Sequence, residues 1–277
     1  MPSFHVHPDV MLLLGGVWAA YLLAVRLHRR GGAATEDGYR RRQILFSIGM
    51  GALLVGSTWP VHDLAEQRLY AVHMFQHMLY TLVAPPLLIA GIPAWMWRGL
   101  VHVRPLGAVF RFLVRPIVAL ALFNGVLLFT HWPAVVEAAV RSEPLHFALH
   151  VLIVGSALVM WWPVMSPLPE LPALSAPGQI VYLFLQSIAP MIPASFLTFG
   201  HSPLYPVYAG FPRIWGLSAL EDQLIAGLLM KLAGGAILWG FIVAIWFRWY
   251  ARDEREDFDT VRLTGVERDV RAGLMKP

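Results

Sequence analysis

The chain has 277 residues, of which 57% are hydrophobic and only 14% are charged. A water-soluble domain carries about a quarter charged residues, and the mean hydropathy of this chain is +0.60. The composition therefore excludes a soluble globular domain of this length and indicates that lipid surrounds most of the chain. The sequence contains no cysteine, which excludes disulfides, thiolate metal sites and thiol catalysis.

Seven apolar stretches are long enough, or nearly so, to cross a membrane, which requires about 20 residues. In chain order they are Val10–Val25, Gln43–Trp59, Met74–Trp97, Ile117–Phe129, Phe147–Val164, Ile180–Phe199 and Leu224–Phe247. The fourth is short unless it continues through Trp132 to Val135. The sequence thus predicts an all-α integral membrane protein, a bundle of seven transmembrane helices.

Prolines predict irregularities in two of these helices, because proline removes a backbone hydrogen bond. Pro85 and Pro86 predict a kink or an early end of the third helix, and Pro93 follows closely. Pro190 and Pro193 predict a bend in the sixth.

The distribution of Lys and Arg predicts the orientation. Seventeen of them lie in 26–42, 98–115 and 248–277, and three lie in the segments predicted on the opposite side. Since basic loops face the cytoplasm, we expect an outside N-terminus, a cytoplasmic C-terminus, a transmembrane domain over 1–247 and a charged cytoplasmic tail over 248–277. The same distribution explains the pI of about 9.6 without a nucleic-acid partner.

Nine of the eleven histidines fall in outer loops or at outer helix ends under this topology. They are His5, His7, His62, His73, His77, His131, His146, His150 and His201. An unpaired imidazole is costly in lipid, but imidazole is the commonest metal ligand in proteins. For His5, His7 and His201, hydrogen bonds to water or lipid headgroups are the simpler interpretation.

Two histidine pairs have the spacing of a metal site. His73 and His77 lie four residues apart at the start of the third helix, and His146 and His150 repeat that spacing at the start of the fifth. Residues at i and i+4 share one helical face, so each pair can direct two nitrogens to one point. These four are the predicted core metal ligands.

Supporting residues are expected at a similar depth. His62 and His131 are predicted as further ligands, and Asp63 as a ligand or as a residue that orients one. Met74, Met78 and Met191 lie nearby; methionine at helical spacing is ordinarily a packing residue. Imidazole and thioether ligands without thiolate favour copper among the common metals.

Lys231 is the only basic residue well inside a predicted span. It either extends to the outer interface or pairs with Glu221, Asp222 or Asp63. The other polar residues of the spans, Gln76, Asn124 and Gln186, are expected to form hydrogen bonds between helices.

Short sequence blocks follow one another in a fixed order between about Trp59 and Trp249. They are His73-Met-Phe-Gln-His77-Met-Leu, Ala84-Pro-Pro-Leu-Leu, Thr130-His-Trp-Pro133, Glu143-Pro-Leu-His146, Trp161-Trp-Pro163, Leu197-Thr-Phe199, Pro203-Leu-Tyr-Pro206, Leu220-Glu-Asp-Gln223 and Gly234-Gly235. In this order they resemble the polytopic CtaG family of cytochrome c oxidase assembly factors, which is distinct from the single-span copper chaperone of the same name.

The resemblance implies a role in maturing a haem–copper oxidase in a bacterial plasma membrane, with oxidase subunits as partners and copper delivery as the favoured step. Three other hypotheses remain open. A haem-binding membrane protein, as an electron carrier or haem-modifying protein, would take one axial His from each of two helices. A copper transporter would need a polar path across the bilayer, and an assembly scaffold would bind no metal. No catalytic triad, phosphate loop or paired intramembrane carboxylates are found, so an enzyme is not expected.

Overall fold

The computed structural model describes residues 7–30 and 38–271, with side chains as far as Arg255. His5 therefore lies outside the described residues. The regular structure of this part is entirely helical. Its α-helices are α1 (Pro8–Arg30), α2 (Tyr39–Ser57), α3 (Val61–Gln67), α4 (Tyr70–Met78), α5 (Ala84–Gly91), α6 (Ala94–His102), α7 (Leu106–Leu113), α8 (Pro116–Thr130), α9 (Pro133–Val140), α10 (Glu143–Met165), α11 (Ala176–Ile188), α12 (Met191–Phe199), α13 (Pro206–Ala209), α14 (Ala219–Leu228) and α15 (Gly234–Arg271). Two π-helical turns, η1 (Leu79–Val83) and η2 (Leu229–Ala233), join α4 to α5 and α14 to α15.

Six helical stretches among the described residues are long and apolar enough to span a membrane. They are Pro8–Arg30, Tyr39–Gln67, Tyr70–Gly91, Glu143–Met165, Ala176–Phe199 and Ala219–Arg255. A seventh exists only if α7 and α8, which meet at 86°, form one bent span. The chain is thus an all-helical, multi-pass membrane protein, while the seventh span and the orientation stay predictions.

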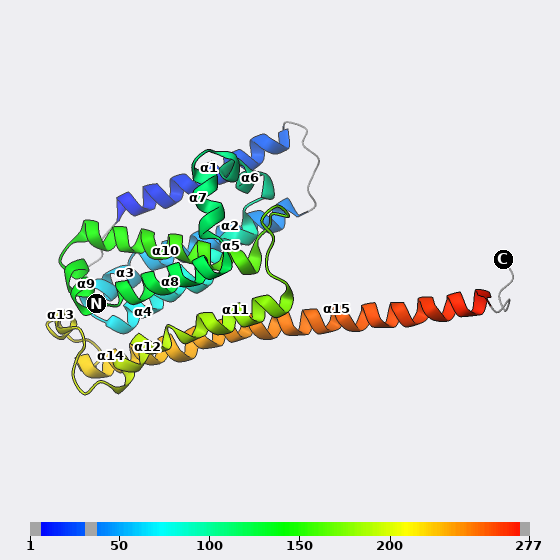
Figure 1. Ribbon diagram of the computed structural model, residues 1–277. Helices are drawn as coiled ribbons and strands as arrows, with labels where there is room; N and C mark the ends of the chain where they lie inside the picture. The colour runs from blue at the N-terminus through cyan, green and yellow to red at the C-terminus, as the bar shows by residue number, and fades with distance from the viewer. Residues whose placement is uncertain (1–6, 31–37, 272–277) are drawn as a thin grey trace.

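The helices form a bundle from which one helix projects (Figure 1). Helix α10 packs against α5 and α8, and α5 packs against α2. Helices α11 and α12 lie along α15 and α14, and α1 packs on α2. The short helices α3, α9 and α13 lie at one end of the bundle, and α15 extends far beyond the opposite end (Figure 1). The predicted tail from Arg248 therefore begins as a continuation of the last helix.

The fourth apolar stretch keeps its predicted bounds within one residue at each end. Helix α8 stops at Thr130 and does not continue to Val135. Trp132 has extended backbone angles and Pro133 begins α9, because a residue before proline is biased away from the helical region. The 15 residues of α8 extend about 22 Å, less than the hydrocarbon thickness of about 30 Å.

The third stretch shows how the bundle accommodates its prolines. The helix runs from Tyr70 to Gly91 and breaks at Pro93, so Trp97 belongs to a separate helix. Pro85 has no N–H to donate to the carbonyl of Thr81 one turn earlier. The chain forms η1 there, and the indole N–H of Trp161 donates to that carbonyl at 2.8 Å. A neighbouring helix thus satisfies the backbone group that the proline leaves free.

Close contact between α2 and α5 depends on a glycine. A Cβ atom on Gly91 would lie 2.5 Å from the backbone nitrogen of Phe46 and 2.7 Å from its Cα. The carbonyl of Gly91 also accepts the hydroxyl of Tyr21 at 2.8 Å. Small residues let membrane helices approach in this way, and Gly91 fixes how α5 sits between its neighbours.

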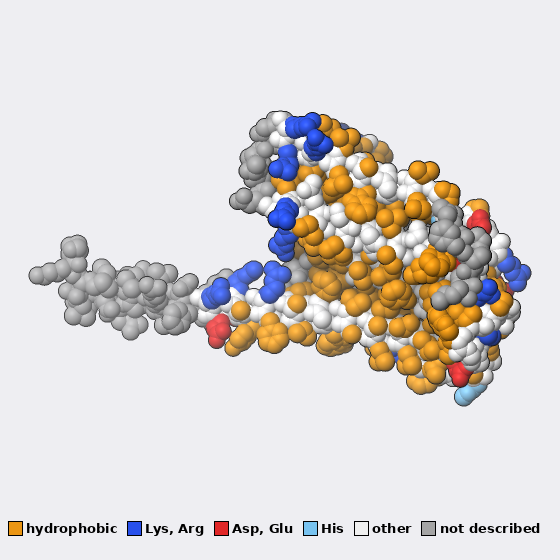
Figure 2. All heavy atoms as spheres, turned by 180° about the vertical axis from the view of Figure 1, so that it is seen from behind, with side chains coloured by type: hydrophobic (Ala, Val, Ile, Leu, Met, Phe, Trp, Pro, Cys, Tyr) orange, Lys and Arg blue, Asp and Glu red, His pale blue; other side chains and the backbone are white. Residues whose placement is uncertain are grey.

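Polar and apolar side chains separate along the bundle. Figure 2 shows hydrophobic side chains across the middle of one face and Lys and Arg gathered at the end from which α15 projects. Most of the Lys and Arg visible in this view lie at that end and a few lie at the opposite end, which agrees with the uneven distribution in the sequence.

Candidate metal centre

The two predicted histidine pairs meet at the end of the bundle opposite the projecting helix. His73 and His77 lie on α4, and His146 and His150 lie in the first two turns of α10. Ring centroids are 4.3 Å apart within the first pair and 4.2 Å apart within the second. Between helices, His73 lies 5.8 Å from His146 and 6.0 Å from His150. The i, i+4 spacing therefore presents both pairs to a common space.

Three of these histidines have converging ligand atoms. One nitrogen each of His73, His146 and His150 lies within 4.8 Å of the other two. Ligands of a tetrahedral or trigonal metal with bonds of about 2.0–2.1 Å lie about 3.3–3.6 Å apart. Small rotations of the rings would close this difference. His73 and His146 are buried and His150 is half-buried, so the converging nitrogens face the protein interior and not lipid.

His131 and His62 extend the cluster in opposite directions. The ring of His131, at the end of α8, lies 5.6 Å from that of His77. The ring of His62, in the first turn of α3, lies 5.9 Å from that of His146. The six predicted histidines thus form a continuous row, which we call the histidine row: His62, His73, His77, His131, His146 and His150.

Asp63 and His7 lie beside one end of the histidine row. Asp63 is buried, and its Oδ2 lies 3.4 Å from Nε2 of His7. The ring of His7 in turn lies 4.7 Å from that of His62. Asp63 is in neither group of converging ligand atoms among the described residues. Its contact is with His7, which is not a predicted ligand, so the ligand role and the orienting role of Asp63 both stay predictions. His201 is exposed.

Several buried nitrogens of the row have no hydrogen-bond partner in the described structure. Apart from Nε2 of His146, which lies near a carboxylate, they are Nδ1 of His73, Nδ1 of His77, Nε2 of His131 and Nε2 of His150. Each buried polar atom without a partner costs about 1–3 kcal/mol. Four such atoms in one place are what a cation-binding cluster requires, because a ligand nitrogen must keep its lone pair available.

The orientation of His131 is fixed by its backbone neighbours. Its Nδ1 lies 2.7 Å from the carbonyl oxygen of Leu127, and since a carbonyl only accepts, Nδ1 carries the proton. Nε2 then has the lone pair of a metal ligand. The carbonyl of His131 accepts the hydroxyl of Tyr205 at 2.8 Å. Burial raises the pKa of Tyr205 to about 12, so this hydroxyl stays protonated at neutral pH.

Glu66 is a residue of the site that the sequence analysis missed. Its two carboxylate oxygens lie 3.4 Å from Nε2 of His62 and 3.1 Å from Nε2 of His146. The second contact has ion-pair distance without hydrogen-bond geometry. Glu66 follows His62 by four residues, which is the spacing of the two histidine pairs, and that spacing was the available signal.

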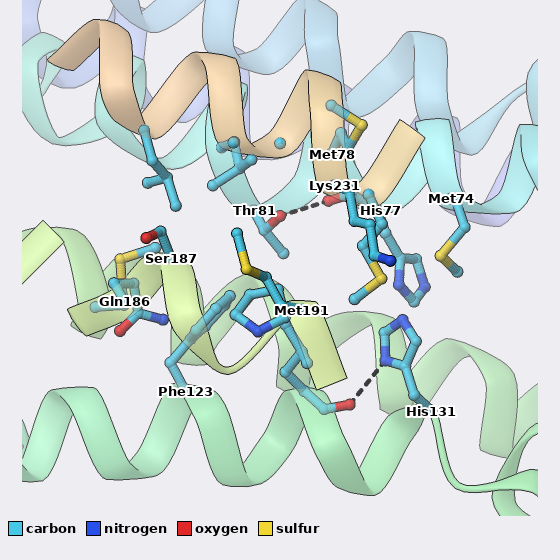
Figure 3. A pocket seen from close by; sticks show the side chains of 18 of the residues that line it. Met74, His77, Met78, Thr81, Phe123, His131, Gln186, Ser187, Met191 and Lys231 are labelled. Atoms are coloured by element: carbon cyan, nitrogen blue, oxygen red, sulfur yellow. Dashed lines mark hydrogen bonds between the residues drawn. The ribbon is translucent and has the colours of Figure 1, made fainter. Parts of the chain in front are cut away.

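A cavity lined by methionines adjoins the row on the side of His77 and His131 (Figure 3). It has a volume of about 70 Å³. Its lining contains Met74, Met78, Met160, Met191 and Met230. The three methionines noted in the sequence therefore face one cavity, together with two further ones from α10 and η2.

Lys231 also lines this cavity, from η2. Its ammonium lies 4.4 Å from the centre of the Phe199 ring, which is a cation–π distance. Among residues with described side chains, no carboxylate lies within ion-pair distance of it. Of its three predicted partners, Glu221 caps its own helix at Ser218 and Asp222 lies 3.7 Å from Arg213.

Comparison with known proteins identifies the family. The family model for cytochrome c oxidase caa3 assembly factors, CtaG, matches residues 19–252. The chain belongs to this family. No curated protein and no solved structure matches it. Membership agrees with the resemblance drawn from the sequence blocks and covers most of the chain.

Not every block that carries the family resemblance contributes to the histidine row of this assembly factor. In Leu220–Gln223, the amide of Gln223 donates to the carbonyl of Leu197 at 3.3 Å and its oxygen accepts the N–H of Leu204. This block ties the segment after α12 to α14. Predicted interhelical hydrogen bonds are also confirmed: Asn124 and Gln186 join α8 to α11 at 3.2 Å, and Gln76 donates to the carbonyl of Gly56 at 2.7 Å.

Proposed function

We propose that this assembly factor binds copper as cargo through His73, His146 and His150 and supplies it to a haem–copper cytochrome c oxidase during assembly. The protein would lie in the bacterial plasma membrane, with the histidine row at the extracytoplasmic face, where copper reaches the oxidase. Oxidase subunits would be its partners.

One observation carries the proposal. Three imidazole nitrogens from two helices converge within 4.8 Å in a buried cluster, in a chain whose family assembles an oxidase. The sequence separation between His73 and His146 means that the fold itself must assemble this set. A group of histidines that served only to contact lipid headgroups would have no reason to face inward.

The donor chemistry favours copper over zinc or iron. The chain has no thiolate, and the cavity beside His77 and His131 offers thioethers from α4, α10, α12 and η2. Imidazole and thioether together suit Cu(I) and release it more readily than a closed thiolate cage does. His77, His131 and His62 would act as supporting ligands, and Asp63 would orient its neighbours.

The test is a Cu(I) titration of protein purified without a histidine tag, against a competing chelator. We expect one tightly bound ion in the wild type and a loss of affinity of at least about tenfold in His150→Ala and in His73→Ala/His77→Ala, since each removes direct ligands. His201→Ala is the matched control, because this exposed histidine lies outside the row. Cytochrome c oxidase activity in membranes should fall with copper affinity.

The other hypotheses predict different results. A haem protein would show a Soret band after purification, and a transporter would move copper into sealed vesicles. A metal-free scaffold would support full oxidase activity in all the histidine variants. Unchanged Cu(I) affinity in both the His150 and the double variant would refute the proposed site.

A further inference from the structure

We propose that His62, Glu66 and His146 form a second, chemically distinct site, which takes a divalent cation such as Zn²⁺ and competes with the Cu(I) site for His146. The competition rests on the copper function proposed above. The existence of the divalent site does not, because its three ligands and its test are separate.

The geometry of the three residues is already close to that of a metal site. Glu66 places one oxygen 3.4 Å from Nε2 of His62 and the other 3.1 Å from Nε2 of His146. Ligand atoms of a tetrahedral metal site lie about 3.3 Å apart. One ligand atom from each residue lies within 4.8 Å of the other two. Nε2 of His62 faces the carboxylate of Glu66. Nε2 of Gln76 lies 3.1 Å from Nδ1 of the same ring, and because an ion bound at Nε2 requires the ring proton on Nδ1, binding replaces this hydrogen bond.

The chemistry of this set differs from that of His73, His146 and His150. Two imidazoles and one carboxylate bind borderline divalent ions such as Zn²⁺, whereas an all-imidazole set beside thioethers suits Cu(I) better. The carboxylate also supplies a negative charge that neutralises part of a divalent ion. Glu66 is half-buried, so this attraction is screened less than it would be at a fully exposed surface.

A cleft leads to the second site. It has a volume of about 460 Å³ and is lined by α1, α2, α3 and α10. Its polar end contains the three proposed ligands together with His7, Asp9 and Glu143. Acidic residues at that end raise the local concentration of cations, so the cleft is a suitable approach for an ion.

The shared residue makes the two sites compete. His146 is the only residue common to both groups of converging ligand atoms among the described residues. A ring turned toward Glu66 to bind a divalent ion is withdrawn from His73 and His150. Binding of Zn²⁺ must then weaken binding of Cu(I), and by linkage Cu(I) must weaken binding of Zn²⁺ by the same factor. No electron transfer is involved, because each ion keeps its charge.

The test is a titration of the metal-free full-length protein with Zn²⁺ alone, compared across four variants. We expect Glu66→Gln and His62→Ala each to weaken Zn²⁺ binding by at least about tenfold. His150→Ala should leave Zn²⁺ binding unchanged while weakening Cu(I) binding at least about tenfold. Glu137→Gln is the control, because it removes a carboxylate on α9 that lies outside the cleft.

A spectroscopic measurement guards against misfolded variants. Co²⁺ bound to the wild type should give the visible absorption of a tetrahedral site with nitrogen and oxygen ligands, and Zn²⁺ should displace it. Saturating Zn²⁺ should also raise the apparent Kd for Cu(I) at least about tenfold in the wild type and not in Glu66→Gln.

Three outcomes would overturn the inference: unchanged Zn²⁺ affinity in Glu66→Gln, loss of Zn²⁺ binding in His150→Ala, or simultaneous full occupancy by Zn²⁺ and Cu(I). A protein that binds Zn²⁺ as described but no Cu(I) would contradict the proposed function and the competition and leave the second site standing.

Discussion

The carboxylate of Asp222 accepts the backbone N–H of Tyr70 at 2.8 Å and that of Ala71 at 2.9 Å, across about 150 residues of sequence. These are the first two residues of α4, whose N–H groups have no partner within the helix. A side chain from α14 thus caps the helix that carries His73 and His77. The cap fixes the start of this helix, and Asp222 is buried, as is His73.

Replacing Asp222 by Asn should destabilise the protein and weaken the metal site together. An amide oxygen can accept one of the two N–H groups, and its NH₂ group then faces the other, at a cost of about 1–3 kcal/mol. The measurement is the thermal unfolding midpoint in detergent, with Cu(I) affinity read on the same sample. Glu221→Gln is the control: this neighbouring carboxylate is exposed and caps only its own helix, so water replaces its hydrogen bond. Equal midpoints for the two variants would contradict this account of the cap.

Tyr205→Phe should weaken copper binding without disrupting the fold. The variant loses the hydroxyl that holds the carbonyl of His131 at 2.8 Å, and outer-sphere hydrogen bonds of this kind typically change metal affinity 10–100-fold. Tyr182→Phe is the control, because its hydroxyl also donates to a buried carbonyl, that of Met160, away from the row. Loss of copper affinity in both variants would point to general destabilisation.

The same tyrosine predicts a pH dependence. The folded-state pKa of Tyr205 is about 12, above the value of about 10 in an unfolded chain. A group whose pKa is raised on folding stabilises the fold fully below its unfolded pKa, and that contribution is lost as the pH rises toward 12. The thermal midpoint of the wild type should therefore fall more steeply between pH 10 and 12 than that of Tyr205→Phe. If the midpoints of the two proteins fell in parallel over this pH range, the proposed contribution of Tyr205 would be contradicted.

Trp161→Phe should lower the free energy of unfolding more than Trp162→Phe does, although the two residues are adjacent and both buried. The indole N–H of Trp161 satisfies the carbonyl of Thr81, which would lose its partner at a cost of about 1–3 kcal/mol. The indole N–H of Trp162 has no hydrogen-bond partner in the described structure. The test is thermal unfolding of the two variants in detergent. Equal decreases in the unfolding midpoint would argue against the role of Trp161 as the partner of the carbonyl that Pro85 leaves free.

Gly91→Ala should destabilise the contact of α2 with α5 by about 1–3 kcal/mol, because the added Cβ meets the backbone of Phe46. Gly51→Ala, in α2, is the control. Nothing lies within 4 Å of its added Cβ, and alanine in a helix is favoured over glycine by about 0.5–1 kcal/mol. A midpoint that falls for Gly91→Ala and holds or rises for Gly51→Ala is the expected result. The opposite order would contradict the packing argument.

Much of the site was predictable because helical spacing is a local property. The i, i+4 repeats of His73 with His77 and of His146 with His150 place each pair on one helix face whatever the fold, and the structure brings both faces together. Asp63 could not be assigned from sequence, because its contact with His7 joins α3 to the segment before α1. The bounds of α8, Pro116–Thr130, agree with the predicted Ile117–Phe129, and the conditional extension to Val135 does not form because Trp132 and Pro133 end the helix.

The sequence by itself determined that lipid surrounds most of the chain, where the long apolar helices lie, and which histidines share a helix face, because these properties depend on composition and on spacing over a few residues. The short helices α3, α7, α9 and α13 were not predicted. Only the tertiary structure decided that Glu66 stands between His62 and His146, that Asp222 caps α4, and that Trp161 completes the hydrogen bonding at η1. The contacts of Glu66 with His146, of Asp222 with α4 and of Trp161 with η1 each join residues on different elements. Their proximity depends on how whole helices pack, which no short stretch of sequence specifies.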